Sequence, residues 1–330
     1  MTEATTLSRH ELEAQFGQHR AALTGFCYRM LGSAFEAEDA VQETLVRAWR
    51  FADRFEGRSS VRSWLHRIAT NVCFDHLNGR QRRARPMDMG PASMKPTAVS
   101  EALPEAAWLQ PVPDDRVLPM SADLADPAEQ LVARESIRLA FVAALQYLPP
   151  RQRAVLILRD VLRWKADEVA SLLETSVASV NSALQRARAT LASKDIDTSL
   201  LGTRHSPHDA ALLERYVEAF ESYDMDALVR LLHTDATMSM PPFNMWLQGA
   251  DEVARWMSGP GAECAGSKVV AVRANGLPAF AQYRAAGPGR WHAWAITVLE
   301  PEGELIAGVH AFLDVEALFP LFGLPLDIEG

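Results

Sequence analysis

The residues in this sequence best suited to chemistry are arginines gathered at the end of one expected helix. The stretch WLHRIATNVCFDHLNGRQRR, residues 64–83, begins with apolar residues at helical spacing and ends in a basic cluster. A solvated helix face usually mixes charges of both signs, whereas the polar side here is nearly all positive. Basic groups beside aromatic and small polar residues suit single-stranded nucleic acid, and the preceding loop adds Phe55, Arg58 and Ser59. Alone, the stretch would also fit a generic RNA or phospholipid surface.

A second candidate nucleic-acid surface lies near the middle of the chain. Lys165 to Leu173 and Val177 to Leu191 are predicted to be two helices joined by a tight turn, which is helix-turn-helix spacing. The outward residues of the second helix are of types that pair with base edges and phosphates in the major groove: Ser179, Asn181, Ser182, Gln185, Arg186 and Arg188. The alternative is a helical hairpin within a bundle.

The C-terminal part holds candidates for a pocket rather than for a nucleic-acid surface. The residues expected to line it are His233, Asp235, Met240, Trp246, Trp294 and His310. A histidine and a carboxylate could act as base and acid if both faced one cavity. However, Asp235 follows His233 by two residues at a corner, where such residues commonly cap or turn the chain. The alternatives are therefore an enzyme, a ligand-sensing pocket, and a packing or regulatory domain without ligand.

Helices are expected to position both basic surfaces. Residues 8–85 predict an all-α domain with helices at Arg9 to Met30, Glu36 to Phe51 and Trp64 to Arg83. Residues 86–127 hold eight prolines and are predicted to be an acidic linker, because proline at that density prevents long helices. Residues 128–193 predict a second all-α domain, in which Glu129 to Leu148 reads as one helix before the helix-turn-helix.

The last part of the chain changes character. After a second linker at residues 194–207, residues 208–328 predict an α+β domain with an antiparallel sheet. Two or three helices come first, and strand-like runs separated by turn signals follow. The expected strands are Ala236 to Met240, Lys268 to Ala274, Ala279 to Ala285, Trp291 to Leu299 and Leu305 to Asp314.

Charge is distributed unevenly over these parts. The net charge is −9, yet residues 47–85 carry ten arginines against three carboxylates. Residues 208–330 carry 17 acidic and seven basic side chains, so two basic segments precede one acidic domain. No apolar run is long enough to span a membrane, no signal peptide is read, and the three cysteines form no metal or disulfide pattern. A cytoplasmic location without metal or other cofactor is therefore expected.

The combination of segments is more specific than any one of them. EAEDAVQETLVRAW, then FEGRSSVRSWLHRIATNVCFDHLNGRQRR, a proline-rich gap, and ALQYLPPRQRAVLILRDVLRWKADEVASLLETSVASVNSALQRARATL follow one another in this order. This order resembles the sigma-70 family of RNA polymerase sigma factors. The most similar group is the extracytoplasmic-function (ECF) group, which keeps the second and fourth conserved regions. The resemblance covers about residues 8–193.

The resemblance implies three sets of site residues. The acidic helix would bind the β′ subunit of RNA polymerase core through Asp39, Gln42, Glu43, Arg47 and Trp49. The arginine-rich helix and its preceding loop would open and hold the −10 promoter element through Phe55, Arg58, Ser59, Asn71, Asp75, Arg80 and Arg83. The helix-turn-helix would read the −35 element through Ser176, Ser179, Asn181, Ser182, Gln185, Arg186 and Arg188.

The C-terminal part has a resemblance of its own. Residues 208–328, chiefly LLERYVEAFESYDMDALVRLLHTDATMSMPP, resemble the SnoaL-like members of the NTF2-like cone fold. That fold serves isomerases, cyclases, hydrolases and binding modules alike, so it does not decide the activity. ECF sigma factors with this extension form known subgroups.

Together these features predict a transcription initiation factor and not an enzyme. The expected partners are the β′ and β subunits of RNA polymerase core and promoter DNA, with an anti-sigma factor or a small ligand as further candidates, and no membrane. The C-terminal domain would modulate activity. The alternatives are an NTF2-like isomerase or hydrolase fused to a nucleic-acid-binding module, and a one-component helix-turn-helix repressor.

Overall fold

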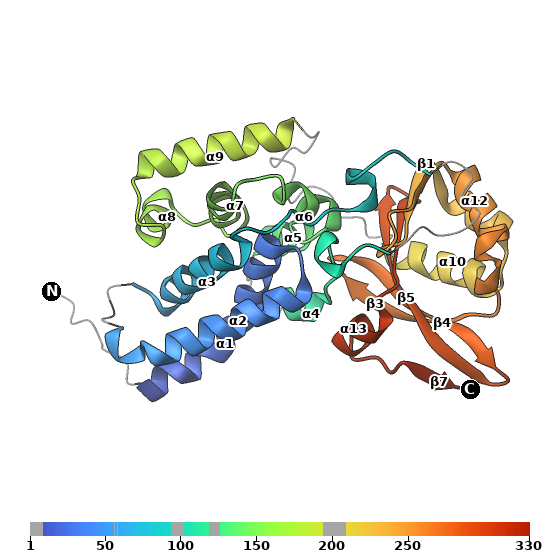
Figure 1. The fold of residues 1–330 in the computed structure, drawn as a ribbon, viewed down its shortest axis with the longest axis horizontal. Helices are drawn as coiled ribbons and strands as arrows, with labels where there is room; N and C mark the ends of the chain where they lie inside the picture. The colour runs from blue at the N-terminus through green and yellow to red at the C-terminus, as the bar shows by residue number, and fades with distance from the viewer. Residues whose placement is uncertain (1–8, 56, 58, 94–101, 119–125, 194–208) are drawn as a thin grey trace. The chain divides into compact units, whose positions relative to one another are not determined.

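The chain forms two compact units, each with its own core. The computed structural model describes residues 9–55, 57, 59–93, 102–118, 126–193 and 209–330 (Figure 1). The first unit combines residues 1–83 with 115–204, and the second combines 84–114 with 205–330. Helical segments followed by an α+β domain confirm the predicted fold class. None of the helices in the described residues is long and apolar enough to cross a membrane.

The first unit begins with three helices, α1 (Arg9–Leu31), α2 (Ala34–Arg50) and α3 (Val61–Leu77). Ser33 and Ser60 cap α2 and α3, because each hydroxyl accepts a hydrogen bond from a backbone N–H three residues on, at 3.2 and 3.1 Å. Apolar residues on the facing sides form a shared core: Leu23, Phe26, Met30, Val41, Leu65 and Val72. Between α2 and α3 lies a single 3₁₀ turn, η1 (Ala52–Arg54).

Helix α3 ends six residues earlier than the sequence predicted. Its last residue is Leu77, and Gly79 follows with φ +73°, a left-handed conformation that glycine adopts without steric cost. The arginines at positions 80, 82 and 83 therefore lie in an irregular segment after the helix. This segment can turn back along α2, which a continued helix could not do.

The second half of the first unit is a set of short helices. They are α5 (Pro127–Glu135), α6 (Leu139–Leu145), α7 (Pro150–Leu156) with its π-helical extension η4 (Ile157–Val161), α8 (Ala166–Leu172) and α9 (Val177–Ala192), preceded by the single turn α4 (Asp114–Val117). The prediction of one helix from Glu129 to Leu148 is wrong. The chain breaks at residues 136–138, where the guanidinium of Arg29 donates to Ser136 Oγ at 2.7 Å and to Ala133 O at 3.0 Å.

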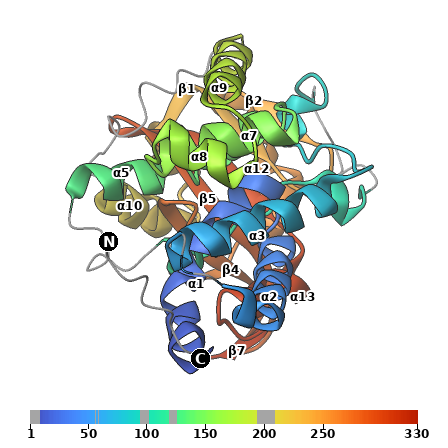
Figure 2. The same ribbon diagram turned by 90° about the vertical axis from the view of Figure 1, so that its left-hand side faces the viewer.

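The two helical halves share one interior. Helix α3 lies between the α1–α2 pair and helices α7 and α8 in both views (Figures 1 and 2). Two buried arginines join the halves: Arg29 binds the break after α5, and Arg153 donates to Met30 O and, at 2.7 Å, to Gln146 Oε1. Burial lowers the pKa of each arginine to about 10, so both remain charged at neutral pH.

The second unit is a seven-stranded sheet with helices on it. Its strands are β1 (Leu232–Ser239), β2 (Trp246–Gln248), β3 (Lys268–Ala274), β4 (Leu277–Gly287), β5 (Arg290–Glu302), β6 (Leu305–Phe312) and β7 (Asp327–Glu329). The order is β2-β1-β6-β5-β4-β3, with β7 paired to β5, and only β1 and β6 run parallel.

Three helices pack against the concave side of this sheet: α10 (Asp209–Glu221), α11 (Met225–Leu231) and α12 (Ala250–Ser258), the last followed by η6 (Pro260–Cys264). Tyr216 and Phe220 of α10 pack against Phe280 of β4, each with its ring tilted and the centroids 5.7 Å apart. A further helix, α13 (Val315–Leu321), packs near the sheet, where Phe319 meets Tyr283 edge to face at 5.1 Å.

Part of the expected linker is a component of the second unit. We call residues 84–93 and 102–114 the strap, because backbone hydrogen bonds hold them to the C-terminal sheet. Ser93 N–H donates to Trp246 O at 2.8 Å, and Leu103 N–H donates to Pro242 O at 2.9 Å. The prolines exclude long helices here, as predicted, but they leave extended segments free to bond at a sheet edge.

The end of the strap is bound most extensively. Val112 and Asn275 exchange two hydrogen bonds, of 3.0 and 3.1 Å. Asp114 accepts from Gly276 N–H at 2.7 Å and from Arg273 Nε at 3.2 Å. Trp108, Leu109 and Val112 are buried. The strap therefore has a polar anchor at Asp114 and an apolar underside.

Candidate nucleic-acid and protein interfaces

Helix α2 presents an exposed, partly apolar face. Asp39 and Gln42 are exposed, and further along the same side Val46 and Trp49 are 48% and 51% exposed. These positions recur at intervals of three and four residues, so they lie on one stripe of the helix. Phe51, just after the helix, is 44% exposed. A contiguous exposed apolar patch rimmed by polar groups is typical of a protein-binding site.

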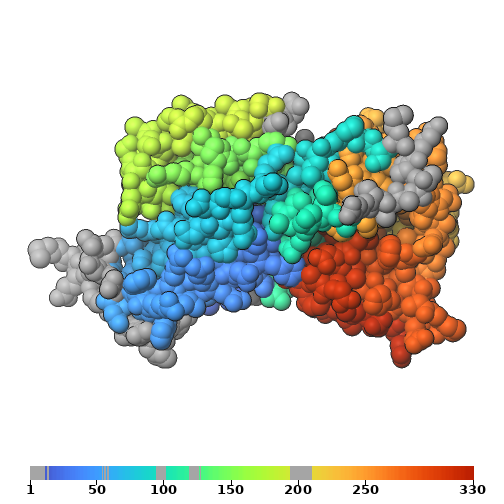
Figure 3. All heavy atoms as spheres, in the orientation of Figure 1, coloured from blue at the N-terminus to red at the C-terminus, as the bar shows by residue number. Residues whose placement is uncertain are grey.

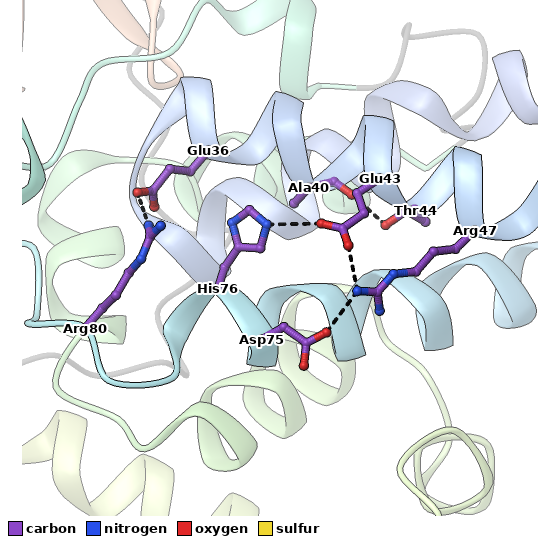
Figure 4. A network of polar contacts seen from close by, with 8 residues as sticks. All are labelled: Glu36, Ala40, Glu43, Thr44, Arg47, Asp75, His76 and Arg80. Atoms are coloured by element: carbon purple, nitrogen blue, oxygen red, sulfur yellow. Dashed lines mark hydrogen bonds and ion pairs between the residues drawn. The ribbon is translucent and has the colours of Figure 1, made fainter.

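Glu43 and Arg47 lie beside that stripe and face α3 instead. Arg47 Nη2 donates to Glu43 Oε1 at 2.6 Å and to Asp75 Oδ2 at 3.0 Å, and His76 Nε2 lies 3.4 Å from Glu43 Oε2 (Figure 4). Burial lowers the pKa of Arg47, but the hydrogen bonds to Asp75 and Glu43 outweigh it and raise the pKa overall. This network joins α2 to α3, so it orients the exposed stripe.

The basic segment after α3 is also tied to α2. Glu36 pairs with Arg80 and, at 2.9 Å, with Arg83 Nη2 (Figure 4 shows the first pair). Arg83 is only 6% exposed, whereas about half of the Arg80 side chain is accessible. The structure therefore places Asp75, Arg80 and Arg83, all expected at DNA, in ion pairs within the first unit. Arg83 is the one that is buried.

A groove follows the loop before α3. It has a volume of about 810 Å³, and Phe55, Gly57, Ser59, Ser60, Ser63, Trp64 and Arg67 line one side of it. Phe55 and Trp64 lie with their ring centroids 5.0 Å apart. Asp167, Glu168 and Ser171 of α8 line the other side. Asn71 is exposed on α3, and Arg58 lies outside the described residues.

The helix-turn-helix has the outward surface that its sequence predicted. Ser176 caps α9 by accepting from Ser179 N–H at 3.1 Å, and Ser179, Asn181, Gln185 and Arg186 are exposed. Ser182 accepts from Arg186 Nη1 at 2.7 Å. The atoms of α9, yellow-green in Figure 3, form an outer edge of the first unit.

Arg188 is held in place by an acidic partner. Its Nε and Nη2 donate to the two carboxylate oxygens of Asp160 at 2.9 and 2.7 Å. These hydrogen bonds raise the pKa of Arg188 despite partial burial. About half of the side chain remains exposed, so the guanidinium is both oriented and accessible.

Three contacts between α3 and the second helical half were not predicted from the sequence. Arg67 pairs with Glu174 of the helix-turn-helix turn, and Arg62 lies over the Trp164 ring at 5.2 Å. His66 is fully buried between Phe26 and Trp164, with ring centroids 5.5 and 5.1 Å away. These residues are far apart in sequence, and no local spacing could bring them together.

His66 is a buried histidine that lacks, within the described part of the chain, a hydrogen-bond partner on one of its two ring nitrogens. Its Nδ1 lies 2.8 Å from Arg62 O, and its Nε2 has no hydrogen-bond partner among the described residues. Burial is the largest effect and, with the nearby positive charge of Arg62 and His19, lowers the pKa of His66 to about 4. The ring is therefore neutral at neutral pH, and protonation would place a charge in an aromatic interior.

The second unit contains a cavity of about 410 Å³ between the sheet and helices α10 and α12. Met240 and Trp294 are among its lining residues, as expected. The other four pocket candidates lie elsewhere. His233 accepts from Asp235 N–H at 3.2 Å, Trp246 Nε1 donates to Gly90 O at 3.0 Å, and buried His310 lies 2.8 Å from Ser239 Oγ. No group of metal-ligating side chains occurs in the part of the chain that the structure describes.

Comparisons with known proteins match each part of the chain in turn. Residues 16–83 match the family description "Sigma-70 region 2", residues 138–191 match "Sigma-70, region 4", and residues 213–309 match "SnoaL-like domain". The Mycobacterium tuberculosis protein "ECF RNA polymerase sigma factor SigG" is 45% identical over 96% of this chain and 85% of its own length. "ECF RNA polymerase sigma factor SigW" of Bacillus subtilis is 28% identical over 50% of this chain and 78% of its own length.

A solved structure shares the fold over nearly the whole chain. It is the "Mycobacterium tuberculosis extracytoplasmic function sigma factor SigJ", with a TM-score of 0.60 and 22% identity. The match covers 97% of this chain and 100% of the other. The succession of two helical regions and an α+β domain is therefore common to both.

Proposed function

Because this chain belongs to the extracytoplasmic-function sigma factors of the sigma-70 family, we propose that its SnoaL-like domain modulates initiation by holding the segment between regions 2 and 4. As a sigma factor the protein binds RNA polymerase core and promoter DNA and directs promoter-specific initiation. The observation that carries the proposal is the set of hydrogen bonds between the strap and the C-terminal sheet.

The exposed stripe on α2 is the proposed polymerase-binding surface. Asp39, Gln42 and Trp49 would contact the core, and Val46 extends their apolar area. Glu43 and Arg47 would act through the network with Asp75 and His76, which sets the position of α2 against α3. A helix face with exposed valine and tryptophan loses unfavourable hydration when a partner covers it.

The groove beside the loop before α3 is the proposed −10 surface. Its aromatic pair, Phe55 and Trp64, offers a stacking platform for an unstacked base, while Ser59 and the exposed Asn71 offer hydrogen bonds. Arg58, which lies outside the described residues, would supply positive charge for the DNA backbone. Arg80 and Arg83 would have to leave Glu36 to reach a phosphate, so we propose that they position the segment in the free protein.

The outward side of α9 is the proposed −35 surface. Asn181 and Gln185 can pair with adenine and Arg186 with guanine or phosphate, whereas Arg188 is pre-oriented by Asp160. Ser176, Ser179 and Ser182 complete the helix start, where backbone N–H groups favour a phosphate.

The free protein cannot read both promoter elements in the arrangement described. Their centres are about 25 base pairs apart, which is about 85 Å at 3.4 Å per base pair. In the first unit, however, α3 contacts α8 directly, and Arg67 pairs with Glu174 across that contact. Regions 2 and 4 must therefore separate when both elements are bound.

The strap limits that separation because it lies between the two regions in the chain. Region 2 ends at Arg83, where the strap begins, and nine residues, 118–126, join α4 to α5. Nine extended residues reach about 30 Å. While the strap stays on the C-terminal sheet, the SnoaL-like domain is inserted into the connection between the regions. The strength of the contacts between the SnoaL-like domain and the strap therefore affects the free energy needed to separate regions 2 and 4.

We propose in addition that the SnoaL-like domain is not an enzyme. Among the described residues that line its cavity, the titratable side chains are Tyr216, Glu263, Cys264 and Arg284. His233, Asp235 and His310 lie outside it, so the histidine–carboxylate pair that acid–base chemistry would need is not aimed into one cavity. An anti-sigma partner and a cytoplasmic location, where RNA polymerase acts, remain predictions.

Run-off transcription with purified polymerase core tests the modulatory role. The variant Asp114→Asn removes the charge that binds Arg273 while keeping the side-chain shape, so the strap should release more easily. We expect about two- to fivefold more transcript, since a partly exposed ion pair is worth up to about 1 kcal/mol.

The matched control is Asp115→Asn, because Asp115 is the neighbouring residue, carries the same charge and is exposed. Equal transcription from the two variants at every core concentration would contradict the proposed role of the strap. Arg273→Gln should reproduce the effect of Asp114→Asn, since it breaks the same ion pair from the other side.

A further inference from the structure

The cavity of the SnoaL-like domain has the size of a small-molecule site. It lies between the concave side of the sheet, helix α10 and the turn that follows α12, and its volume of about 410 Å³ falls in the range of known ligand pockets. None of its described lining residues belongs to the strap, to α2 or to α9.

The walls favour a flat, apolar molecule. Tyr216, Phe220 and Phe280 form one aromatic corner, with ring centroids 5.7 to 6.1 Å apart. Met238, Met240 and Met257 supply thioethers, which are flexible and make favourable contacts with aromatic rings. Such a lining can adapt to the outline of a ring system, whereas a long polar chain would find few hydrogen-bond partners in it.

Polar groups are few and sit at defined places. Gln282 Nε2 donates to Ser267 Oγ at 3.1 Å, so this amide is already engaged. Burial raises the pKa of the Tyr216 phenol and of the Cys264 thiol, which keeps both groups neutral at neutral pH. The interior end of the cavity is therefore uncharged among the described residues.

The edge of the cavity is different, because a guanidinium lies there. Arg284 stacks over the Trp294 ring at 4.0 Å and donates to Glu263 O at 3.1 Å. It also pairs with the Glu263 carboxylate. The Arg284 side chain is only 19% exposed, whereas that of Glu263 is 78% exposed. A mostly covered cation therefore has a largely solvated counter-ion.

That asymmetry makes the counter-ion exchangeable. Holding Arg284 against Trp294 does not depend on the Glu263 carboxylate, because the stacking and the hydrogen bond to the Glu263 backbone carbonyl remain when the carboxylate leaves. Because the Glu263 end of the pair is solvated, a ligand anion delivered from inside the cavity can replace the carboxylate at small cost. The guanidinium fork binds a carboxylate through two parallel hydrogen bonds.

We propose that this cavity binds a flat, mainly apolar carboxylic acid, with the rings among Tyr216, Phe280 and the methionines and the carboxylate on Arg284. Glu263 turns to solvent when the acid binds. The site discriminates against neutral analogues of the same ring system, because these leave the Arg284–Glu263 pair in place and gain only the apolar contact. This inference goes beyond the proposed control of initiation and does not depend on it.

Isothermal titration calorimetry on the full-length protein tests the proposal with two probes, 2-naphthoate and its neutral methyl ester. We expect saturable binding of 2-naphthoate and weaker binding of the ester. Arg284→Gln should weaken naphthoate binding about tenfold and leave the ester unchanged, since it removes one charge-assisted contact. Glu263→Gln should strengthen naphthoate binding, because it removes the competing carboxylate.

The matched control is Arg290→Gln, which removes an exposed arginine of the same domain that does not line the cavity. An absence of saturable binding of both probes, or an equal loss with Arg290→Gln, overturns the proposal. Equal affinity for acid and ester overturns the role of Arg284. If Arg284→Gln fails to fold, Glu263→Gln still tests the proposal, because tighter binding of the acid but not of the ester shows that the Glu263 carboxylate opposes a ligand anion at this site, and unchanged binding of the acid overturns it.

Discussion

At the scale of single residues, His66 links the stability of the first unit to pH. Its pKa is lowered from 6.5 to about 4, so the folded state disfavours the charged ring. A base with a depressed pKa contributes full stability above pH 6.5, and that stability is lost as the pH falls from 6.5 towards 4. Between pH 7.5 and 5 the expected loss is about 2 kcal/mol.

Thermal unfolding of wild type and His66→Phe at both pH values measures this loss. Phenylalanine keeps the ring between Phe26 and Trp164 but does not titrate, so the variant should lose less stability on acidification. His19 also has a pKa lowered by burial and by Arg62, which leaves part of the effect in the variant. Identical pH dependence in the two proteins would contradict a buried neutral His66. The control is His233→Gln, which lies outside this interior. It should lose as much stability between the two pH values as wild type does.

Residue types predicted the surfaces better than they predicted each residue's contacts. The outward set on α9 was readable because helical periodicity alone decides which side faces solvent, whereas the site residues on α2 came from the family resemblance. Arg83 was read as a DNA contact because its charge is visible in the sequence. Its burial against Glu36 is not visible, since it depends on where the chain turns after Gly79. Arg67, Trp164 and Glu174 meet only in the folded unit.

At the scale of elements, the exposed stripe of α2 makes a prediction about core binding. Trp49→Ala should weaken the affinity for polymerase core by about tenfold or more, because an exposed tryptophan at a protein interface is often a dominant contact. Val46→Ala should have a smaller effect in the same direction. Fluorescence anisotropy of the labelled protein titrated with core measures both changes.

Val270→Ala serves as the control for Val46→Ala, since Val270 is similarly exposed, at 39%, but lies on β3 of the other unit. Circular dichroism should show unchanged helicity in all variants, because neither side chain on α2 is part of the core. If Trp49→Ala binds polymerase core as tightly as wild type does, this stripe is not the polymerase-binding surface.

Long elements were predictable from the sequence, and short ones were not. Helices α1, α2 and α9 and strands β3 to β6 extend over seven or more residues each, which is enough for their residue types to show in the sequence. Strands β2 and β7 have three residues each, too few to show alternation, and α13 has only seven residues and contains Pro320, which disfavours a helix. The strap was read as a linker because its bonding partners, such as Trp246 and Asn275, lie more than 100 residues later.

At the scale of the whole molecule, the contact between regions 2 and 4 competes with promoter binding. Opening must break the Arg67–Glu174 pair and uncover the Trp164 ring, so part of the free energy of DNA binding is spent on separation. Residues that stabilise the closed arrangement without touching DNA should therefore weaken promoter binding. Glu174 is such a residue, because it lies in the turn before α9 and binds the basic side of α3.

Glu174→Gln should strengthen promoter binding by the holoenzyme about two- to fivefold, because an exposed ion pair is worth up to about 1 kcal/mol. The exchange also removes one negative charge, which alone favours DNA. Asp167→Asn on α8 corrects for this, since Asp167 is exposed and lines the same groove. Anisotropy of a labelled promoter fragment at several salt concentrations measures both variants. If Glu174→Gln raises promoter affinity more than Asp167→Asn does, the separation of regions 2 and 4 is supported. If both raise it equally, the change in net charge explains the whole effect.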